Sequence, residues 1–346
     1  MKTFRILRAL ALVLMIFSIA LPAAASTSAA GNEVSPLFQL LPLVVVGLVI
    51  NEATLKAIFT NFNVIFNEAV AAAQAQWNKI AMEVPSNTSI EEYDWLGAFP
   101  KMREWIGERF LKNLKDYSWQ IKNKDWEATV AVPRNSIEDD RIGIYRTIVS
   151  GMGASAVTHV DDLVFGLLNA GFTAKGYDGK TFFATDHASG SNKASGGGSP
   201  LSTTSYPLAI AALKGVKDDQ GNPMLNGTEP LILTVGPALE QTARQLLNND
   251  YISVAGGSTQ NNVWKGSAGL VVSPKITSAT AWFLTADFNG LKPFIFQRRR
   301  TAQFVALQDP TTSDHVFKKK EFLFGTDSRD NAGYGLHQLA YGSVGA

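Results

Sequence analysis

One long helical periodicity in the middle of the chain constrains the fold most. Over residues 137–170, apolar side chains recur at steps of three and four, which is the spacing of one face of an α-helix. Asn135 or Ser136 can cap its start, and the acidic residues 138–140 suit its first turn. Roughly 30 residues at about 1.5 Å each predict a helix of about 45 Å. The surrounding domain must therefore pack along this helix as a spine.

Two contrasting segments precede the predicted spine. Residues 51–80 carry apolar side chains at helical steps, which predicts an amphipathic helix that packs on its own domain or on a neighbouring molecule. Residues 83–131 are rich in tryptophan and tyrosine, and the stretches 119–121 and 126–130 alternate as half-buried strands do. This aromatic stretch predicts a projecting loop or hairpin.

The sequence after the spine divides at a Gly/Ser-rich stretch, 188–200, which predicts a flexible break. Strand-like and helix-like segments then alternate to about residue 288, as expected of a compact α/β subdomain. A short helix is predicted at 206–216, a buried strand at 231–235 and a helix that starts at Pro237.

The C-terminal part of the chain has a strand-like pattern, over 291–308 and again over 315–342. Large apolar side chains cluster there in short groups, at Phe294-Ile-Phe296, Val316-Phe317 and Phe322-Leu-Phe324. Long strands are therefore expected to close the fold.

Charge and cysteine content exclude several classes of function. The 346 residues hold 31 basic and 30 acidic side chains, which gives a formal net charge of +1. Proteins that grip nucleic acid usually carry a basic excess, so we expect no such role. A protein that forms a wall around DNA without gripping it remains an alternative. The absence of cysteine excludes disulfides, thiolate metal sites and cysteine nucleophiles.

The N-terminal segment differs from the rest of the chain. Residues 1–26 have a basic start, an apolar run and a small-residue cleavage site, as a secretory signal does. A second apolar stretch, 37–50, is too short to span a membrane. Three interpretations stay open: export, a true start of translation near Val49, or a leader that is removed during assembly. We expect residues 1–48 to lie outside the working protein.

The search for chemistry yields one weak candidate. No nucleophile elbow, phosphate-binding loop, dinucleotide fingerprint or zinc-protease motif occurs. Asp186-His187 could form half of a metal or acid–base site, but no third ligand stands nearby in the sequence. We therefore interpret this pair as a polar loop edge, and we expect no catalytic, cofactor-binding or metal site.

The other histidines are also expected to be structural. His159 and Asp162 could share one helix face at i, i+3 spacing, beside Asp161, and a salt link is expected there rather than a metal pair. His315 and His337 stand alone in the sequence.

Two basic triplets, Arg298–Arg300 and Lys318–Lys320, lie in strand-like sequence, where alternate side chains face opposite ways. Ion pairs between subunits, contact with enclosed DNA, and a solvated edge that discourages unwanted strand pairing remain as alternatives.

Several long blocks of the body are specific enough to indicate a family. They are NEATLKAIFTNFNVIFNEA (51–69), WNKIAMEVPSNT (77–88), YDWLGAFPKMREWIGER (93–109), WEATVAVPRNSIEDDRIGIY (126–145), YDGKTFFATDH (177–187), KPFIFQRRR (292–300) and DHVFKKKEFLFGTDSRDNAGYGLHQLA (314–340). Together they closely resemble the major head subunit gpT of Mu-like phages and prophages. The resemblance runs from about Val49 to the C-terminus, and residues 1–48 are not part of it.

The resemblance implies an α+β chain with the major capsid fold of tailed phages. Such a subunit has an N-terminal arm, an extended β loop, a peripheral domain with a long spine helix, and an axial α/β domain. The corresponding expected ranges here are 49–82 for the arm, 83–131 for the loop, 132–200 with 289–346 for the peripheral domain, and 201–288 for the axial domain.

The resemblance also implies a structural protein rather than an enzyme. It implies assembly of pentamers and hexamers into an icosahedral shell around DNA, with no cofactor and no small-molecule ligand. Scaffold, head-protease and portal proteins are the expected partners, contact with packaged DNA is expected to be non-specific, and the location is the virion after assembly in the host cytoplasm. The alternative is an exported periplasmic or cell-surface binding protein, which depends on the N-terminal segment alone.

Overall fold

The structure is a computed structural model, and it describes residues 50–94, 96, 119–139, 141–196, 198–218, 221–253, 259–307 and 313–345. Contacts divide the chain into two units, 1–45 and 46–346, and every described residue belongs to the second unit. The expected leader, 1–48, and the middle of the expected projecting loop, 95 and 97–118, therefore lie outside the described residues.

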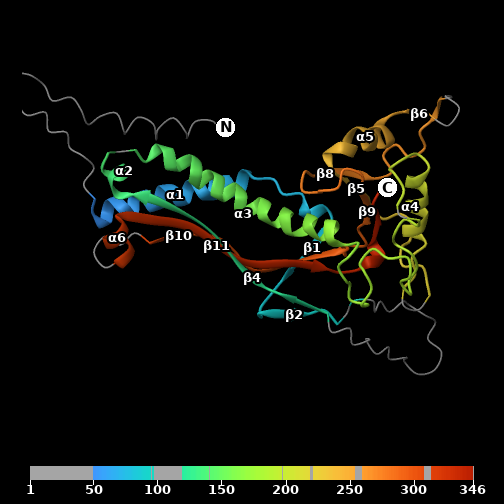
Figure 1. Ribbon diagram of the computed structural model, residues 1–346, viewed down its shortest axis with the longest axis horizontal. Helices are drawn as coiled ribbons and strands as arrows, with labels where there is room; N and C mark the ends of the chain where they lie inside the picture. Colours follow the sequence, from blue (N-terminus) through green and yellow to red (C-terminus); the bar gives the residue numbers. More distant parts are fainter. Residues whose placement is uncertain are drawn as a thin grey trace, which may run out of the picture. The chain divides into compact units, whose positions relative to one another are not determined.

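Two helices cover one face of a four-stranded sheet (Figure 1). Helix α1 (Glu52–Ala72) runs beside helix α3 (Gly143–Ala170), and both contact the sheet. The order of its strands is β1 (Ala81–Pro85), β10 (Phe294–Leu307), β11 (Glu321–Tyr334) and β4 (Lys124–Pro133). Strand β11 is antiparallel to both of its neighbours, and β1 is parallel to β10.

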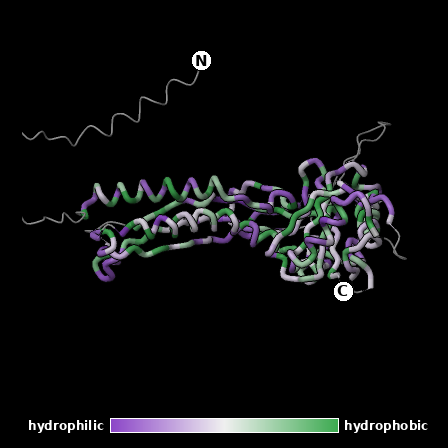
Figure 2. Tube along the Cα trace, turned by 90° about the horizontal axis from the view of Figure 1, so that it is seen from above, coloured by the Kyte–Doolittle hydropathy of each residue, from purple (hydrophilic) through white to green (hydrophobic). Residues whose placement is uncertain are grey.

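Aromatic side chains from the helices and the sheet form the core between these layers. The rings of Phe62 on α1 and Phe324 on β11 meet edge to face at 5.1 Å, and Phe59 and Phe66 both lie 5.5 Å from Phe304 on β10. Such edge-to-face and tilted pairs are favourable arrangements of aromatic rings. Figure 2 shows hydrophobic and hydrophilic residues alternating along the helical turns, as expected of helices with one face on a core.

The predicted spine is confirmed as α3, but its start differs from the prediction. The helix has 28 residues, so it is about 42 Å long at about 1.5 Å per residue. Residues 134–138 form a separate short helix, α2 (Arg134–Glu138), which ends at Asp139. Buried Ile137 packs α2 against the same core as α1. The residues predicted to form the first turn of the spine therefore belong to α2.

A second four-stranded sheet forms the α/β part. Its order is β12 (Ala340–Ser343), β9 (Trp282–Ala286), β5 (Leu231–Val235) and β8 (Gly269–Val272). Helix α4 (Ser205–Lys214), the 3-10 helix η2 (Pro237–Leu239) and helix α5 (Glu240–Asn248) accompany it. The predicted helix, strand and helix start between 206 and 237 are thus confirmed, the helix ending two residues early.

The C-terminal strand crosses between the two sheets. After β11 the chain forms the 3-10 helix η3 (His337–Leu339), and β12 then pairs antiparallel with β9. The strand-like C-terminal segment therefore divides between the sheets, whereas the expected ranges place all of 289–346 in one part. Local sequence pattern predicts a strand but does not say which sheet it joins.

Two other predictions about the C-terminal half are wrong. Val316 and Phe317 lie in helix α6 (Asp314–Lys319), which Ser313 caps, and not in a strand. The stretch 188–200 is packed rather than a flexible break, because Asn192 is buried and bonds to the backbone of Phe182, Ala184 and His337.

Smaller elements complete the description. They are the 3-10 helix η1 (Trp77–Lys79) and the strand pairs β2 (Ile90–Glu92) with β3 (Gln120–Lys122) and β6 (Tyr251–Ser253) with β7 (Thr259–Asn261). None of the helices in the described part of the chain combines the length and apolar content that crossing a membrane requires.

Candidate functional site

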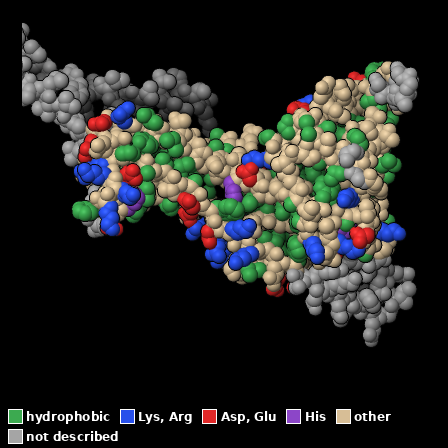
Figure 3. All heavy atoms as spheres, viewed as in Figure 1, with side chains coloured by type: hydrophobic (Ala, Val, Ile, Leu, Met, Phe, Trp, Pro, Cys, Tyr) green, Lys and Arg blue, Asp and Glu red, His purple; other side chains and the backbone are tan. Residues whose placement is uncertain are grey.

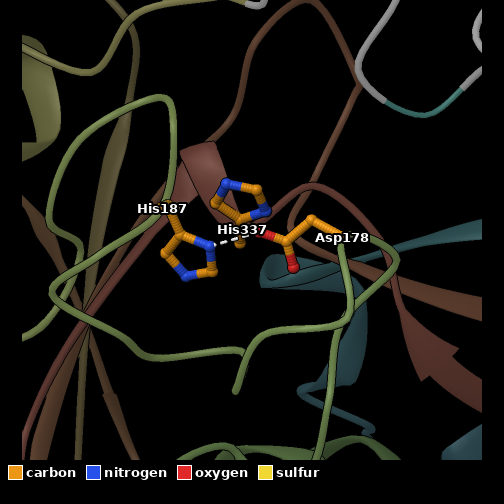
Figure 4. Close-up of side chains that lie close together, drawn as sticks. All are labelled: Asp178, His187 and His337. Atoms are coloured by element: carbon orange, nitrogen blue, oxygen red, sulfur yellow. Dashed lines mark hydrogen bonds and ion pairs between the residues drawn. The ribbon is translucent and has the colours of Figure 1, made fainter.

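The structure separates the predicted pair Asp186-His187. The carboxylate of Asp186 is exposed and pairs with Lys180, whereas the ring of His187 is completely buried. His187 Nδ1 lies 2.6 Å from Oδ2 of Asp178, on the same loop after α3 (Figure 4). The partner of the histidine is thus a carboxylate that the sequence reasoning missed.

A second histidine completes a buried cluster. The ring of His337, from η3, stacks on the ring of His187 with centroids 3.8 Å apart and planes 12° apart. Its Nε2 lies 2.9 Å from Oγ of Ser189. We call Asp178, His187, Ser189 and His337 the histidine cluster. Because η3 joins the two sheets, the cluster fastens the loop after α3 to the crossover between them.

Oxygen atoms surround the ring of His187. Its Nδ1 faces the Asp178 carboxylate, and its Nε2 lies 3.3 Å from the carbonyl oxygen of Phe182. A proton on Nδ1 therefore donates to Asp178. Burial works to raise the pKa of Asp178, but the hydrogen bond from His187 holds that pKa below its usual value.

His337 is held neutral by its surroundings. Burial, reinforced by the electrostatic effect of His187, lowers the pKa of His337 to about 3. The side chain is buried beneath the stacked ring of His187, which opposes a charge on it.

The cluster has ligand types that metals use, but not a suitable geometry. One ligand atom from each of Asp178, His187 and His337 lies within 4.8 Å of the others. A metal binds imidazole along the lone pair in the ring plane, and two parallel stacked rings cannot both direct lone pairs at one ion. Nδ1 of His187 is in addition occupied by its hydrogen bond to Asp178. The arrangement fits a hydrogen-bonded contact that holds the fold.

The predicted His159–Asp162 link does not form. His159 Nε2 lies 3.4 Å from Oδ1 of Asp330 on β11, and its ring packs 4.4 Å from Trp126. Asp162 instead pairs with Lys275. The i, i+3 spacing places two side chains near one another, but partners across the helix–sheet interface are closer here.

Asp161, next to them on α3, has a role that the sequence did not indicate. Its buried Oδ1 accepts hydrogen bonds from the backbone nitrogens of Gln76 and Trp77, at 2.9 and 2.8 Å. Burial is the main cause that raises the pKa of Asp161. The carboxylate thus ties the start of η1 to the spine.

The basic triplets are dispersed among acidic partners. Arg298 pairs with Glu83 at 3.1 Å, and Arg300 pairs with Asp327. Lys318 and its neighbours end helix α6, so the predicted strand position is wrong for this triplet. On the face shown in Figure 3, basic and acidic side chains are interspersed rather than gathered into one basic patch.

Exposed apolar side chains are the other feature with functional potential. Phe317 on α6 is 86% exposed. Further large apolar residues with exposed side chains are Val64, Ile144, Ile148, Leu208, Val263, Val305 and Leu307. Scattered exposure of this kind is ordinary on monomers, but several such positions along the spine and β10 suit contact with other molecules.

The missed residues share one cause. His337 lies 150 residues after His187 along the chain, and only the crossover into β12 brings the two rings together. Asp178 lies nine residues before His187 in an irregular loop, where no periodicity predicts the direction of a side chain.

Comparisons with known proteins agree with this architecture. The family model described as Mu-like prophage major head subunit gpT matches residues 55–199, 193–276 and 275–346. The chain is 32% identical to the major capsid protein of Escherichia phage Mu, over 85% of this chain and 74% of that protein. It is 31% identical to the Mu-like prophage FluMu major head subunit of Haemophilus influenzae strain Rd, over 84% and 73%.

A solved structure shows the same fold. A chain from the procapsid of bacteriophage JBD30 superposes with a TM-score of 0.53 and 31% sequence identity, over 85% of this chain and 76% of that one. The predicted α+β capsid fold is therefore confirmed. Because the family model covers nearly all of the body and both relatives exceed 30% identity, the chain belongs to the Mu-like prophage major head subunit gpT family.

Proposed function

We propose that the chain is the building block of a phage head, of which many copies assemble into an icosahedral shell around phage DNA. Family membership over nearly the whole body carries this conclusion. The relatives are structural shell proteins, so the surfaces of the chain, and not a reaction centre, perform its function. The exposed apolar side chains on the spine, β10 and α6 are the kind of surface that such assembly requires.

The finer expectations extend this proposal. Pentamers and hexamers would form the shell, with scaffold, head-protease and portal proteins as partners during assembly in the host cytoplasm. Packaged DNA would meet the shell through non-specific phosphate contacts, for which exposed Arg299 is the best placed residue of the arginine triplet.

The division into structural regions is also a proposal. The helix–sheet layer around α3 supports a peripheral domain, and the second sheet with α4 and α5 supports an axial domain. Helix α1 would serve as the arm, and the segment from β2 to β3 would include the extended loop. Placement of β12 in the second sheet supports an axial domain that also contains the last strand.

Expression of the full chain in a bacterial host tests the proposal. We expect closed shells, or rings of the size of capsomers, in the cytoplasmic fraction by sedimentation velocity and negative-stain electron microscopy. A product that stays monomeric at every protein and salt concentration would contradict it. Recovery of the chain from the periplasm as a monomer would favour the exported binding protein, which no comparison supports.

A further inference from the structure

The first sheet has one strand whose outer half lacks a partner on one side. Strand β10 pairs with β11 along its length, but β1 pairs only with residues 294–298. Within the described part of the chain, no strand pairs with residues 299–307 on that side. An open strand edge presents unpaired backbone N–H and C=O groups that can accept another strand.

The opposite edge of the same sheet is open as well. Strand β4 is the last strand in the order, and it pairs with β11 alone among the described strands. Both β10 and β4 are antiparallel to β11, so they are parallel to each other. A second copy placed beside the first in the same orientation therefore offers its β4 as a parallel neighbour to the open edge of β10.

The side chains along the two edges match in this parallel arrangement. The open half of β10 begins with Arg299 and Arg300 and ends with Val305 and Leu307. Strand β4 begins with Lys124, Asp125, Trp126 and Glu127 and ends with Ala131, Val132 and Pro133. A parallel register thus places Arg299 beside Asp125, with Glu127 next along the same face, and the apolar ends beside each other. Arg300 faces the other side of the sheet and pairs with Asp327 of its own chain.

The free charges on the two edges are of opposite sign. Arg299 is exposed, and among the described residues no carboxylate forms an ion pair with it. Glu127 is exposed and accepts a hydrogen bond from the Thr129 hydroxyl, and among the described residues no cation forms an ion pair with it. Lys124 lies over the Trp126 ring, at 5.9 Å from its centroid, and Asp125 pairs with Arg329 of its own chain at 3.5 Å.

We propose that residues 299–307 of β10 pair in parallel with residues 125–133 of β4 from a second copy of this chain. The inference rests on the proposed shell function and names one of its contacts. Because one copy uses β10 and the other uses β4, the contact is head-to-tail, and repetition of it closes a ring or extends a chain of subunits.

The competing two-fold pairing fits the same residues less well. Two copies of β10 related by a two-fold axis would be antiparallel, which brings Arg299 of one copy beside Leu307 of the other. That arrangement gives Arg299 no carboxylate. The parallel β10–β4 contact satisfies both the charged and the apolar halves of the edge.

Paired cysteines test the contact directly, since the native chain has none. In one copy Val305 and Ala131 are separated by β11, because Val305 pairs with Gly325 and Ala131 pairs with Leu323. Two strand spacings are about 10 Å, beyond the limit of about 7 Å for a disulfide, so the two cysteines cannot join within one copy. A full chain with Val305→Cys and Ala131→Cys should give a ladder of disulfide-linked multimers on oxidation.

The single variants are the matched controls. Neither Val305→Cys nor Ala131→Cys alone should give more than traces of dimer, and a strong dimer from Val305→Cys would instead indicate two-fold pairing and overturn the proposal. Shells that form from the double variant without any ladder would also overturn it, while leaving the shell function intact. Failure of the unmodified chain to assemble would remove the shell function itself.

Charge reversal gives an independent readout. Arg299→Glu or Glu127→Arg should each raise the protein concentration needed for assembly about tenfold, because a like-charged pair replaces an attractive one. The double reversal should restore most of the loss. Glu240→Arg on α5, away from both edges, should change little. Equal defects in the double reversal and in the single variants would count against contact between Arg299 and Glu127, which are diagonal neighbours on one face in this register.

Discussion

A single glycine on the spine decides how closely two helices pack. A Cβ on Gly153 would lie 2.6 Å from the carbonyl oxygen of Phe66 and 2.9 Å from Cβ of Ala69, both on α1. Gly151, two residues earlier on the same helix, has nothing within 4 Å of such a Cβ. The two positions therefore separate the effect of packing from the effect of helix propensity.

We expect Gly153→Ala to lower the free energy of unfolding by about 1–3 kcal/mol, since overpacking forces the helices apart. Gly151→Ala should raise it by up to about 1 kcal/mol, because alanine has the better helix propensity. Urea unfolding followed by circular dichroism measures both. Equal effects of the two substitutions would show that the α1–α3 contact is not as close as described.

The histidine cluster predicts acid sensitivity with a defined sign. Burial and the electrostatic effect of His187 lower the pKa of His337 from 6.5 to about 3, so the unfolded chain binds the proton more readily. Stability from this residue is therefore complete above pH 6.5 and is lost progressively as the pH falls toward 3. The lowered pKa of Asp178 acts in the same direction, but only at the acidic end of that range.

Replacement of the titrating ring tests this assignment. His337→Phe keeps an aromatic ring to stack on His187 and removes the proton site. Between pH 7 and 4.5, the native chain should lose a few kcal/mol more of unfolding free energy than the variant, by urea titration at each pH. Parallel pH profiles of the two proteins would mean that His337 does not govern the acid response.

At the scale of elements, the carboxylate of Asp161 fixes the connection between α1 and β1. Its Oδ1 accepts two backbone hydrogen bonds at the start of η1. Asp161→Leu leaves both N–H groups without an acceptor and should lower the free energy of unfolding by about 1–3 kcal/mol. Asp161→Asn retains an acceptor and carries no buried charge, so it should stay close to the native stability.

Hydrogen exchange at Gln76 and Trp77 locates the effect. Exchange of these two amides should accelerate in Asp161→Leu and remain slow in Asp161→Asn, whereas α4 should be unaffected in both. Fast exchange in the asparagine variant would indicate that the charge, and not the acceptor atom, holds η1.

The same scale shows what sequence could and could not predict. The spine was predictable from its continuous helical periodicity, and β5 and β10 from short runs of large apolar side chains. The packed stretch 188–200 was not, since its glycines and serines signal flexibility while one buried asparagine, Asn192, anchors it to distant backbone. Helix α6 was missed because six residues are too few to show a helical period.

The candidate sites were harder to predict than the elements, because they depend more on tertiary contacts. Sequence singled out His187, but it offered Asp186 as partner, because adjacency along the chain was the only proximity available. The partners that matter, Asp178 and His337, are set by a loop and by the crossover into β12. The open edge of β10 likewise appears only once β1 is seen to end at Pro85, opposite Arg298.

For the whole molecule, one aromatic core joins the two sheets. Phe283 from β9 and Ala340 at the start of β12 belong to the same buried cluster as Phe294 and Tyr334 from the first sheet. Phe182 and Phe183, from the loop after α3, connect them. The ring of Phe182 lies 5.2 Å from Phe294, the ring of Phe183 lies 5.4 Å from Phe283, and the two loop rings meet edge to face at 5.0 Å. The sheets should therefore unfold together, since neither keeps a complete core without the other.

Phe183→Ala should weaken that coupling. Truncation of a completely buried phenylalanine lowers the free energy of unfolding by about 3–5 kcal/mol. In the native chain, tryptophan fluorescence and far-ultraviolet circular dichroism should report one coincident urea transition, and in the variant the two transitions should separate. Phe317→Ala is the control, because that ring is 86% exposed and its removal should change the stability by less than about 0.5 kcal/mol. If the two transitions of Phe183→Ala coincide, whatever the stability of the variant, other contacts must couple the sheets. The histidine cluster at the crossover is the nearest of these contacts.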